Sequence, residues 1–343
     1  MTRSEAYPGH PAGIGEGVAF DPSVLRLGGD LRRRGVEPLS SQWHRVRRGI
    51  FVPETDWARM SPTHRHAAFV HGAALCSEHG RMVFARTASA AVHGLPRVSA
   101  WPEIVPILVD AGRPVDREKL VEADDMAVPP RAKTRARGSG PVLRRVAGMC
   151  ENPVVLNGVA VTPVARTIVD LARYDSLENA MAAADFALRL AMCTTEDLMA
   201  EVAVIPKHGH GRPAARLVAD LADSRSGSVG ESLSRVQLFR LNLPRPVLQQ
   251  EFRDERGRIG YTDFAWPGLV GEFDGRMKYR TEFAADPEQV QDILWREKQR
   301  EDRLRRQVDV ARWTWAVALD TVKLGKLLAA HGLRPLARSD WLR

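Results

Sequence analysis

Three carboxylates, Asp263, Glu272 and Asp274, lie in the short segment YTDFAWPGLVGEFDGRMKY, residues 261–279. Most of the other side chains in this segment are aromatic or aliphatic, which is typical of strands in a sheet core. A hard divalent cation such as Mg²⁺ binds carboxylate oxygens and keeps water molecules for chemistry. Such an ion can activate a water molecule and stabilise charge on a phosphoryl oxygen.

A turn centred on Pro267 and Gly268 predicts a β-hairpin whose two strands pair symmetrically around it. In this register Asp263 lies opposite Glu272, with Cβ atoms about 4.5–5.5 Å apart, and strand alternation places Asp274 on the same face. The three carboxylates are therefore predicted to converge on one side of the hairpin. The other predicted pairs are Trp266 with Leu269, Ala265 with Val270, and Phe264 with Gly271.

Carboxylates that face each other destabilise a strand pair unless something compensates their repulsion. A bound Mg²⁺ or Mn²⁺ ion would do so, with Asp263 and Glu272 as ligands and Asp274 beside them. Lys278, four residues after Asp274, could neutralise the cluster, orient the attacking water or meet the scissile phosphate. In the alternative interpretation Asp263 ends a strand, Asp274 belongs to a turn, and Glu272 pairs with an exposed arginine.

Glu231 is a further candidate carboxylate. The tetrapeptide SVGE at 228–231 has the spacing of a capping box, in which the serine and the glutamate close a helix N-terminus. Arg235 lies about one helical turn further on and could pair with Glu231. Glu231 is therefore either a structural cap or a third metal ligand. The two roles differ in whether it approaches Asp263 and Glu272 in three dimensions.

Hydrophobic periodicity and turn residues divide the C-terminal part of the chain into alternating helices and strands. A helix over 229–241 precedes three strands, and a charged helix separates them from a last strand and helix. This order predicts an α/β arrangement around a small mixed sheet. The predicted strands cover 246–254, 258–266, 269–275 and 308–317, and the later helices cover 287–306 and 319–332.

The middle of the chain is predicted to be helical, and the region before it mixed. Thr162 is expected to cap a helix over 162–173 whose first helical residue is Pro163. Further helices are predicted over 62–80, 177–191, 195–204 and 212–223, and strands over 103–110 and 141–149.

Two basic segments could contact nucleic acid. Residues 22–60 contain a short basic helix, a turn and an Arg-rich strand over 45–52, which suits either a winged-helix remnant lying against phosphates or a basic surface ribbon. The charged helix at 290–307 either forms an exposed, salt-bridged face or lines a nucleic-acid groove. The arginines concerned are Arg45, Arg47 and Arg48 in the first segment, and Arg300 and Arg303 in the second.

Length and composition restrict the class of protein. At 343 residues the chain exceeds one ordinary core, so two or three domains are expected. No apolar run approaches the roughly 18 residues of a membrane-spanning helix. The three cysteines are scattered, which argues against a disulfide framework or a zinc site and fits a reducing cytoplasm. A net charge of +8 permits a polyanionic partner such as DNA, although frequent arginine could instead reflect a GC-rich genome.

These patterns predict a multidomain chain of mixed α+β and α/β class. Its predicted parts are a disordered leader (1–20), an α+β region with a partial winged helix (21–150), a helical middle region (151–225), and a C-terminal domain (226–343) whose mixed sheet is flanked by helices. The last boundary follows from the flexible sequence SRSGSVG at 224–230.

Four motifs follow one another in the C-terminal domain: GES at 230–232, LPRPVLQQ at 243–250, TDFAWP at 262–267 and VGEFDGRMKY at 270–279. In this order they resemble the very-short-patch-repair endonuclease-like branch of the PD-(D/E)XK nucleases. The resemblance implies a restriction-endonuclease-like fold, in which a helical Glu, a strand Asp and a following acidic strand motif surround one or two metal ions.

Carried over to this chain, the helical acid is Glu231 and the strand acids are Asp263 and Glu272, with Asp274 in the extended acid motif. The best-known form of the motif has a lysine two residues after the second acid, where this chain has Asp274. The role of Lys278 therefore does not follow from the resemblance.

Three motifs stand out upstream: RRGIFV at 47–52, RTASAAVHGLP at 86–96 and VAVTPVARTIVDLAR at 159–173. With them, the upstream part resembles actinobacterial proteins that join this nuclease-like module to an abortive-infection type IV antitoxin-like region. In those antitoxins an N-terminal winged helix binds promoter DNA, so the resemblance implies DNA and a possible cognate toxin as partners.

Three functions therefore compete. The first is a cytoplasmic, DNA-binding protein with a metal-dependent endonuclease domain. The second is a non-enzymatic, antitoxin-like transcriptional regulator that uses the nuclease-like domain as a scaffold. The third is a protein-interaction module with the helical middle as its docking surface.

Overall fold

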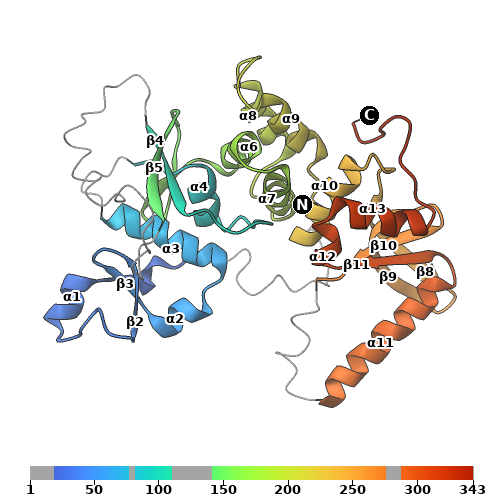
Figure 1. The fold of residues 1–343 in the computed structure, drawn as a ribbon, viewed down its shortest axis with the longest axis horizontal. Helices are drawn as coiled ribbons and strands as arrows, with labels where there is room; N and C mark the ends of the chain where they lie inside the picture. The colour runs from blue at the N-terminus through green and yellow to red at the C-terminus, as the bar shows by residue number, and fades with distance from the viewer. Residues whose placement is uncertain (1–18, 77–81, 110–140, 276–286, 343) are drawn as a thin grey trace, which may run out of the picture. The chain divides into compact units, whose positions relative to one another are not determined.

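The computed structural model describes residues 19–76, 82–109, 141–275 and 287–342 (Figure 1). Within these residues the chain is a mixed α/β protein of helices and several small sheets, which confirms the predicted class at this coarse level. None of the helices in these ranges combines the length and the apolar character that crossing a membrane requires.

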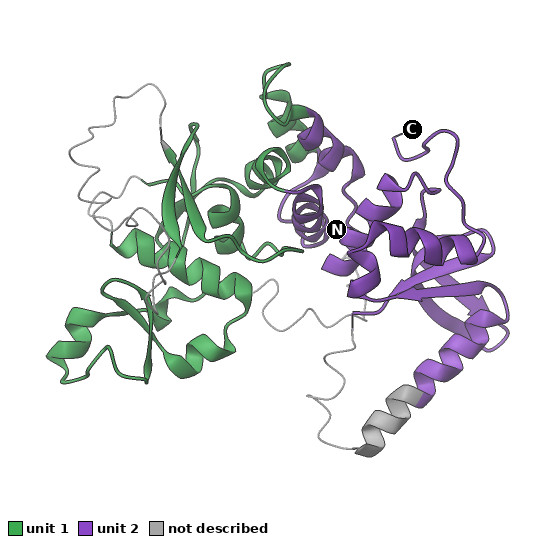
Figure 2. Cartoon of the chain, in the orientation of Figure 1, with its two compact units in different colours: residues 1–175, 196–212 green, residues 176–195, 213–343 purple. Residues whose placement is uncertain are grey.

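The contacts within the chain divide it into two compact units (Figure 2). Unit 1 comprises Met1–Asp175 and Glu196–Arg212, and unit 2 comprises Ser176–Thr195 and Pro213–Arg343. The four domain ranges predicted from the sequence stay predictions, and most of the predicted leader lies outside the described residues.

The first part of unit 1 is a small antiparallel sheet of order β1-β3-β2 with short helices around it. The predicted Arg-rich strand over 45–52 is instead a hairpin, because Gly49 adopts a φ of 80° and reverses the chain. Val46 and Val52 of this hairpin are buried against Trp57. The elements are a 3₁₀ turn (Pro22–Val24), β1 (Arg26–Leu27), α1 (Gly28–Arg33), β2 (Trp43–Arg47), β3 (Ile50–Pro53), α2 (Glu54–Arg59) and α3 (Pro62–Leu75).

The second part of unit 1 packs helices against two short β-ladders. Strands β4 and β5 are parallel, β6 and β7 are antiparallel, and Phe84 bridges the two ladders through Ile107 and Val161. These apolar residues share one buried cluster. The elements are α4 (Arg86–Val92), β4 (Ile104–Val109), β5 (Val142–Ala147), β6 (Val154–Leu156), β7 (Val159–Val161), α6 (Val164–Tyr174) and most of α8 (Thr195–Ala203).

Helix α6 begins one residue later than predicted. Pro163 is its N-cap residue and makes no side-chain cap bond. Thr162 instead uses its hydroxyl to bond the Thr167 hydroxyl at 2.8 Å, and its carbonyl accepts a hydrogen bond from Ser89 at 3.0 Å. Because Ser89 lies on α4, this buried hydroxyl cluster joins α6 to α4.

Two buried histidines on α3 make the stability of unit 1 sensitive to acid. His66 is 2% exposed and stacks on Trp101 with ring centroids 4.8 Å apart. Burial, together with the nearby charge of Arg97, lowers the pKa of His66 to about 3, and burial lowers the pKa of His71 to about 4. The unfolded chain takes up protons on these rings from about pH 6.5 downward. The free energy of unfolding therefore falls as pH falls from 7 towards the lower folded pKa values.

We expect His66 alone to remove roughly 3 kcal/mol of unfolding free energy between about pH 7 and pH 4. His66→Phe, which retains a ring against Trp101, should flatten the pH profile by that amount in urea unfolding. His208→Gln changes an exposed histidine of the same unit and should leave the profile unchanged. Equal pH slopes in wild type and His66→Phe would contradict this expectation.

Unit 2 is built around the four-stranded sheet, in the order β11-β10-β9-β8. Strands β8, β9 and β10 form an antiparallel meander, and β11 returns parallel to β10 after helix α11. The strand predicted over 308–317 is wrong in its second half, where α12 begins. The elements are α7 (Leu177–Arg189), most of α9 (Arg212–Leu221), α10 (Val229–Arg240), β8 (Val247–Asp254), β9 (Gly257–Trp266), β10 (Leu269–Phe273), α11 (Pro287–Arg305), β11 (Asp309–Trp313), α12 (Trp315–Ala318) and α13 (Thr321–Ala330).

Helices cover both faces of this sheet (Figure 1). On one face the indole nitrogen of Trp313 donates to the Ser234 hydroxyl of α10 at 2.8 Å. A Cβ atom at Gly230 would lie 1.9 Å from Cε1 of Phe273, so the approach of α10 to β10 requires glycine there. On the other face Leu304 of α11 packs with Val270 in a buried cluster.

A buried ion pair joins α7 to α10. Arg235 donates from Nη1 to Asp185 Oδ2 at 2.6 Å and from Nη2 to the Leu221 carbonyl. The Ser232 hydroxyl and the Asp223 backbone N–H also donate to Asp185, each at 2.8 Å. The pairing of Arg235 with Glu231 expected from their spacing is thus replaced by a pairing with Asp185, because packing places α7 against this side of α10.

Candidate active site

The hairpin between β9 and β10 has the predicted register, with Trp266, Ala265 and Phe264 paired to Leu269, Val270 and Gly271. Beyond the last of these pairs, Asp263 Oδ2 accepts a hydrogen bond from the Phe273 backbone N–H at 2.8 Å. Asp263 of β9 and Glu272 of β10 therefore occupy neighbouring positions just past the end of the ladder.

Glu231 lies in the first turn of α10. Ser228 is the N-cap residue, and its hydroxyl accepts a hydrogen bond from the Glu231 N–H at 3.2 Å, as the capping-box spacing predicts. The Glu231 carboxylate has other partners: Oε2 accepts from the Gly227 N–H at 2.7 Å and from Gln249 Nε2 at 3.3 Å. Because Glu231 is only 4% exposed, its carboxylate is held between the loop before α10 and strand β8.

The carboxylates of Glu231 and Glu272 both interact electrostatically with that of Asp263. Burial, and then the negative charge of Glu231, raises the pKa of Asp263 well above its usual value of 3.8, and Glu272 raises it further. Burial also raises the pKa of Glu231. Helix α10 and strands β9 and β10 thus bring these acids near one another. Glu231 caps a helix and also takes part in this cluster.

Two arginines neutralise Glu272. Arg300 of α11 donates to Oε1 from Nη1 and Nη2 at 3.0 and 2.6 Å, and Arg312 of β11 places Nη2 2.7 Å from Oε2. Arg312 also contacts Glu297 and Glu301 at 3.2 and 3.1 Å. The alternative prediction is an ion pair between Glu272 and an exposed arginine. The structure pairs Glu272 with two arginines, and both are partly buried.

Asp274 and Lys278 follow β10 along the chain. Asp274 is half-buried, and its backbone N–H donates to the Trp313 carbonyl at 2.8 Å, which continues the contact between β10 and β11 by one residue. Lys278 lies outside the described residues. Its predicted roles stay predictions.

Gln249 is a residue of this site that sequence reasoning did not single out. It adopts a φ of 50° within strand β8, between the pairs Leu248–Phe264 and Gln250–Thr262. Non-glycine residues rarely enter this left-handed region, and such strain persists mainly at functional sites. Gln249 belongs to the segment LPRPVLQQ quoted above, but strand alternation carries no signal for a reversed backbone at one residue.

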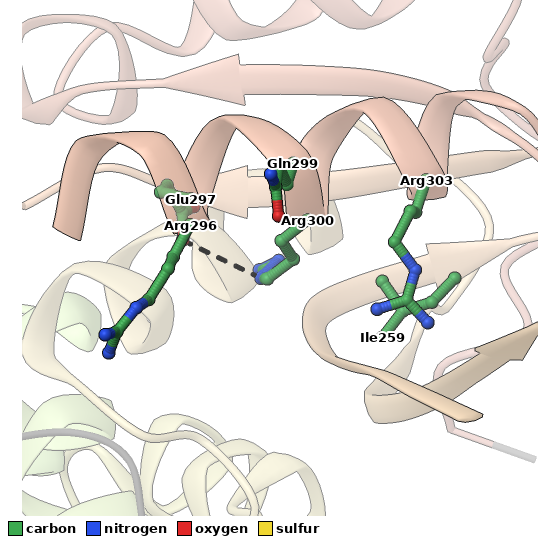
Figure 3. Close-up of a pocket in the computed structure, with 6 residues that line it drawn as sticks. All are labelled: Ile259, Arg296, Glu297, Gln299, Arg300 and Arg303. Carbon is green, nitrogen blue, oxygen red and sulfur yellow. Dashed lines mark ion pairs between the residues drawn. The ribbon is translucent and has the colours of Figure 1, made fainter. Parts of the chain in front are cut away.

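The arginines of α11 predicted to contact nucleic acid have carboxylate partners within unit 2. Arg300 binds Glu272, and Arg303 donates from Nε and Nη2 to Asp254 at 2.8 and 2.5 Å. Both line a shallow hollow of about 410 Å³ along α11. Figure 3 shows Arg296 projecting from the same side of the helix, and Ile259, Glu297 and Gln299 complete the lining.

The three arginines predicted to contact nucleic acid in the N-terminal segment lie on the β2–β3 hairpin of unit 1. Arg45 and Arg48 are exposed. Arg47 is partly buried, donates from Nη1 to the Pro141 carbonyl at 3.3 Å, and has a pKa lowered by burial. Arg47 therefore has an internal structural contact, and the contact of all three with nucleic acid stays a prediction.

The acid cluster fits a hard divalent cation through two of its members. Glu231 and Asp263 offer carboxylate oxygens and make no ion pair with any described residue. Their negative charges repel each other, and a bound cation would offset this repulsion. Glu272 is held by Arg300 and Arg312 and would reach a metal only by exchanging these partners. Across the described ranges, no three or more His, Cys, Asp or Glu side chains are arranged to hold a metal ion.

Unit 2 is thus a mixed sheet between helices, with acids of α10, β9 and β10 near one another. Among known proteins, the chain is similar to the uncharacterized proteins MT2308 and Rv2248 of Mycobacterium tuberculosis strains CDC 1551 / Oshkosh and ATCC 25618 / H37Rv. Each is 35% identical over 115 residues, which cover 33% of this chain and 42% of the relative. No protein-family model matches the chain. No solved structure matches it.

Proposed function

We propose that unit 2 is a metal-dependent endonuclease domain with a restriction-endonuclease-like fold that hydrolyses phosphodiester bonds in DNA. The observation that carries this proposal is that three acids adjoin Phe273. Its N–H bonds Asp263 at 2.8 Å, Glu272 directly precedes it, and Gly230, next to Glu231, packs against its ring. The repulsion among these acids destabilises the folded chain, and a bound cation offsets it. A helical Glu beside two strand acids is also the arrangement that the resemblance to PD-(D/E)XK nucleases implies.

When bound, Mg²⁺ or Mn²⁺ would supply an acidified water molecule and stabilise charge on the scissile phosphate. Glu231 and Asp263 would hold the ion. The Gly227 N–H and Gln249 Nε2 orient the Glu231 carboxylate, and the Phe273 N–H orients that of Asp263. These hydrogen bonds fix the ligand oxygens before substrate arrives, which lowers the reorganisation needed for binding.

The basic surface of α11 would hold the DNA backbone. Arg296, Arg300 and Arg303 lie on one side of the helix and line one hollow (Figure 3). Arginine forks bind phosphate oxygens through two parallel hydrogen bonds. Phosphates would compete with Glu272 for Arg300 and with Asp254 for Arg303.

Incubation of the purified chain with supercoiled plasmid and Mg²⁺ or Mn²⁺ tests the proposal. Nicked or linear products that disappear on adding EDTA are expected. An absence of cleavage across a broad screen of metals and DNA substrates would count against it, as would cleavage that Asp263→Ala leaves unchanged.

A second candidate function is a non-enzymatic, antitoxin-like regulator in the cytoplasm, with a cognate toxin as a partner and unit 2 as a scaffold. The neutralisation of Glu272 by Arg300 and Arg312 favours it, because these ion pairs commit one acid to structure. A mobility-shift assay on the chain's own promoter tests it. Binding that weakens steeply with salt is expected, and its absence rules this function out.

Releasing the Glu272 carboxylate from one of its two arginine partners should strengthen metal binding. Arg312→Met removes one partner of this carboxylate and one positive charge near the cluster, so we expect the Kd for Mg²⁺ to fall about tenfold, equivalent to ~1.4 kcal/mol. Calorimetric titration of the DNA-free protein measures it. Arg253→Met removes a charge from an exposed pair with Glu251 and serves as the control. A Kd raised or unchanged in Arg312→Met would argue that Glu272 stays away from the metal.

A further inference from the structure

Unit 1 contains a group of arginines that the proposed nuclease domain does not use. Arg86, the first residue of α4, places its guanidinium 3.6 Å from the ring centroid of Tyr174. Arg173 of α6 lies 4.9 Å from the same ring. His210 stacks on Tyr174 with centroids 5.2 Å apart. Two guanidinium groups therefore lie against the same aromatic side chain.

These cations have too few counter-charges. Arg86 makes no hydrogen bond or ion pair with any described residue, and burial lowers its pKa, as do the charges of Arg173 and Arg144. The carboxylate that opposes them, Asp170, is already engaged by Arg166 at 3.0 Å and by Arg173 at 3.4 Å. Partly buried like charges are unfavourable without a bound anion between them.

The backbone brings Arg144 to the same place. Arg144 of β5 is paired with Pro106 of β4, and the Pro106 carbonyl accepts a hydrogen bond from the Ala85 N–H at 3.1 Å. Ala85 directly precedes Arg86, so β5 presents an exposed arginine beside the start of α4. Arg144 also has no ion pair among the described residues.

Backbone strain distinguishes Arg86 from the other arginines that the structure describes. Its φ of 51° lies in the left-handed region, which non-glycine side chains seldom adopt. Strain of this kind is retained mainly where a ligand or catalytic group must be positioned. The next residue, Thr87, has a buried hydroxyl without a hydrogen-bond partner in the described ranges.

We propose that Arg86, Arg144 and Arg173 form a binding site for a phosphate group. A phosphate offers several acceptor oxygens to guanidinium forks and supplies the negative charge that the cluster lacks. The phosphate belongs either to a small phosphorylated molecule or to a nucleic-acid backbone. All residues of this site lie in unit 1, so the inference is independent of the endonuclease proposal.

Calorimetric titration of the full chain with inorganic phosphate, in buffer containing EDTA, tests the site. Arg86→Met and Arg144→Met are each expected to weaken binding about tenfold or more. Arg145→Met removes the same charge from the next residue of β5, whose exposed side chain alternates to the other face. It should weaken binding less than about twofold, because only non-specific attraction is lost.

Arg86→Lys provides a test that does not depend on charge loss. It keeps the positive charge but not the planar fork, so affinity should lie between those of wild type and Arg86→Met. Equal weakening by Arg144→Met and Arg145→Met would overturn the proposal. So would the absence of binding by wild type at about 10 mM phosphate. Arg144 is exposed, so its variant keeps the test valid if Arg86→Met fails to fold.

Competition with a short DNA duplex separates the two sources of phosphate. If the duplex displaces phosphate, and Arg144→Met weakens duplex binding more than Arg145→Met does, the site binds the nucleic-acid backbone. If phosphate binding survives saturating duplex, the site binds a small phosphorylated molecule. Either result supports the phosphate site.

Discussion

Asp263→Asn is expected to abolish DNA cleavage while leaving the folded chain at least as stable as wild type at neutral pH. Asparagine is nearly isosteric, and its amide oxygen can still accept the hydrogen bond from the Phe273 N–H. It removes the negative charge that would hold the metal. Loss of a single hydrogen-bond partner of a metal ligand already costs about 10–100-fold in activity, so a loss of at least ~100-fold is expected here.

The stability effect of Asp263→Asn follows from the raised pKa of Asp263. The folded state binds this proton more tightly than the unfolded state, so the unfolding free energy falls as pH rises from about 3.8 through the folded pKa. The variant has no proton to lose at this position. Its Tm should exceed that of wild type at pH 7–8, and the difference should vanish towards pH 4, as thermal unfolding across this pH range measures.

Asp254→Asn is the matched control for stability. In the wild type, a hydrogen bond from Arg303 lowers the pKa of Asp254 to about 2, which is opposite in direction to the shift of Asp263. Asp254 therefore contributes stability above its unfolded pKa, which is lost as pH falls towards 2, and its asparagine variant should be less stable at neutral pH. Wild-type cleavage by Asp263→Asn, or a Tm below wild type at every pH, would refute the role assigned to this carboxylate.

Arg235→Met is expected to destabilise unit 2 by about 3–5 kcal/mol, because it leaves the Asp185 carboxylate buried without its cation. The side chains of Arg235 and Asp185 are 3% and 1% exposed. Methionine has a similar length but cannot donate to Asp185 or to the Leu221 carbonyl. Urea unfolding measures the loss, and hydrogen exchange of α7 and α10 locates it.

Two further variants separate the buried pair from a general effect of lost charge. Arg216→Met breaks an exposed pair with Asp220 in the same unit and should cost no more than about 1 kcal/mol. Asp185→Leu combined with Arg235→Met removes both charges and should recover much of the loss. If the unfolding free energy of Arg235→Met lies within about 1 kcal/mol of the wild-type value, the ion pair does not anchor α7 to α10.

Much of the candidate site follows from local chemistry. The turn at Pro267-Gly268 sets the register of the hairpin, and Gly268 has the positive φ, 76°, that such a turn requires. Strand alternation then brings Asp263 and Glu272 to neighbouring positions. The bond from the Glu231 N–H to Ser228 follows in the same way from a four-residue spacing.

Contacts between distant segments are not accessible to this reasoning. Spacing suggested Arg235 as the partner of Glu231, yet the packing of α7 directs Arg235 to Asp185, 50 residues away. The arginines on Glu272 come from α11 and β11, 28 and 40 residues further along the chain. Gln249, whose backbone leaves the extended conformation, donates a hydrogen bond to Glu231 from 18 residues further along the chain.

The residues that carry the chemistry, the hairpin that aligns two of them and the cap that starts α10 all depend on interactions within a few positions along the chain. Those interactions are encoded in turn residues, strand alternation and capping spacing. Which charges meet is decided by long-range packing, because Glu231, Arg300 and Arg312 reach the hairpin only when α10, α11 and β11 pack against it. Packing of this kind depends on the shapes of whole helices and sheets, which no short segment specifies.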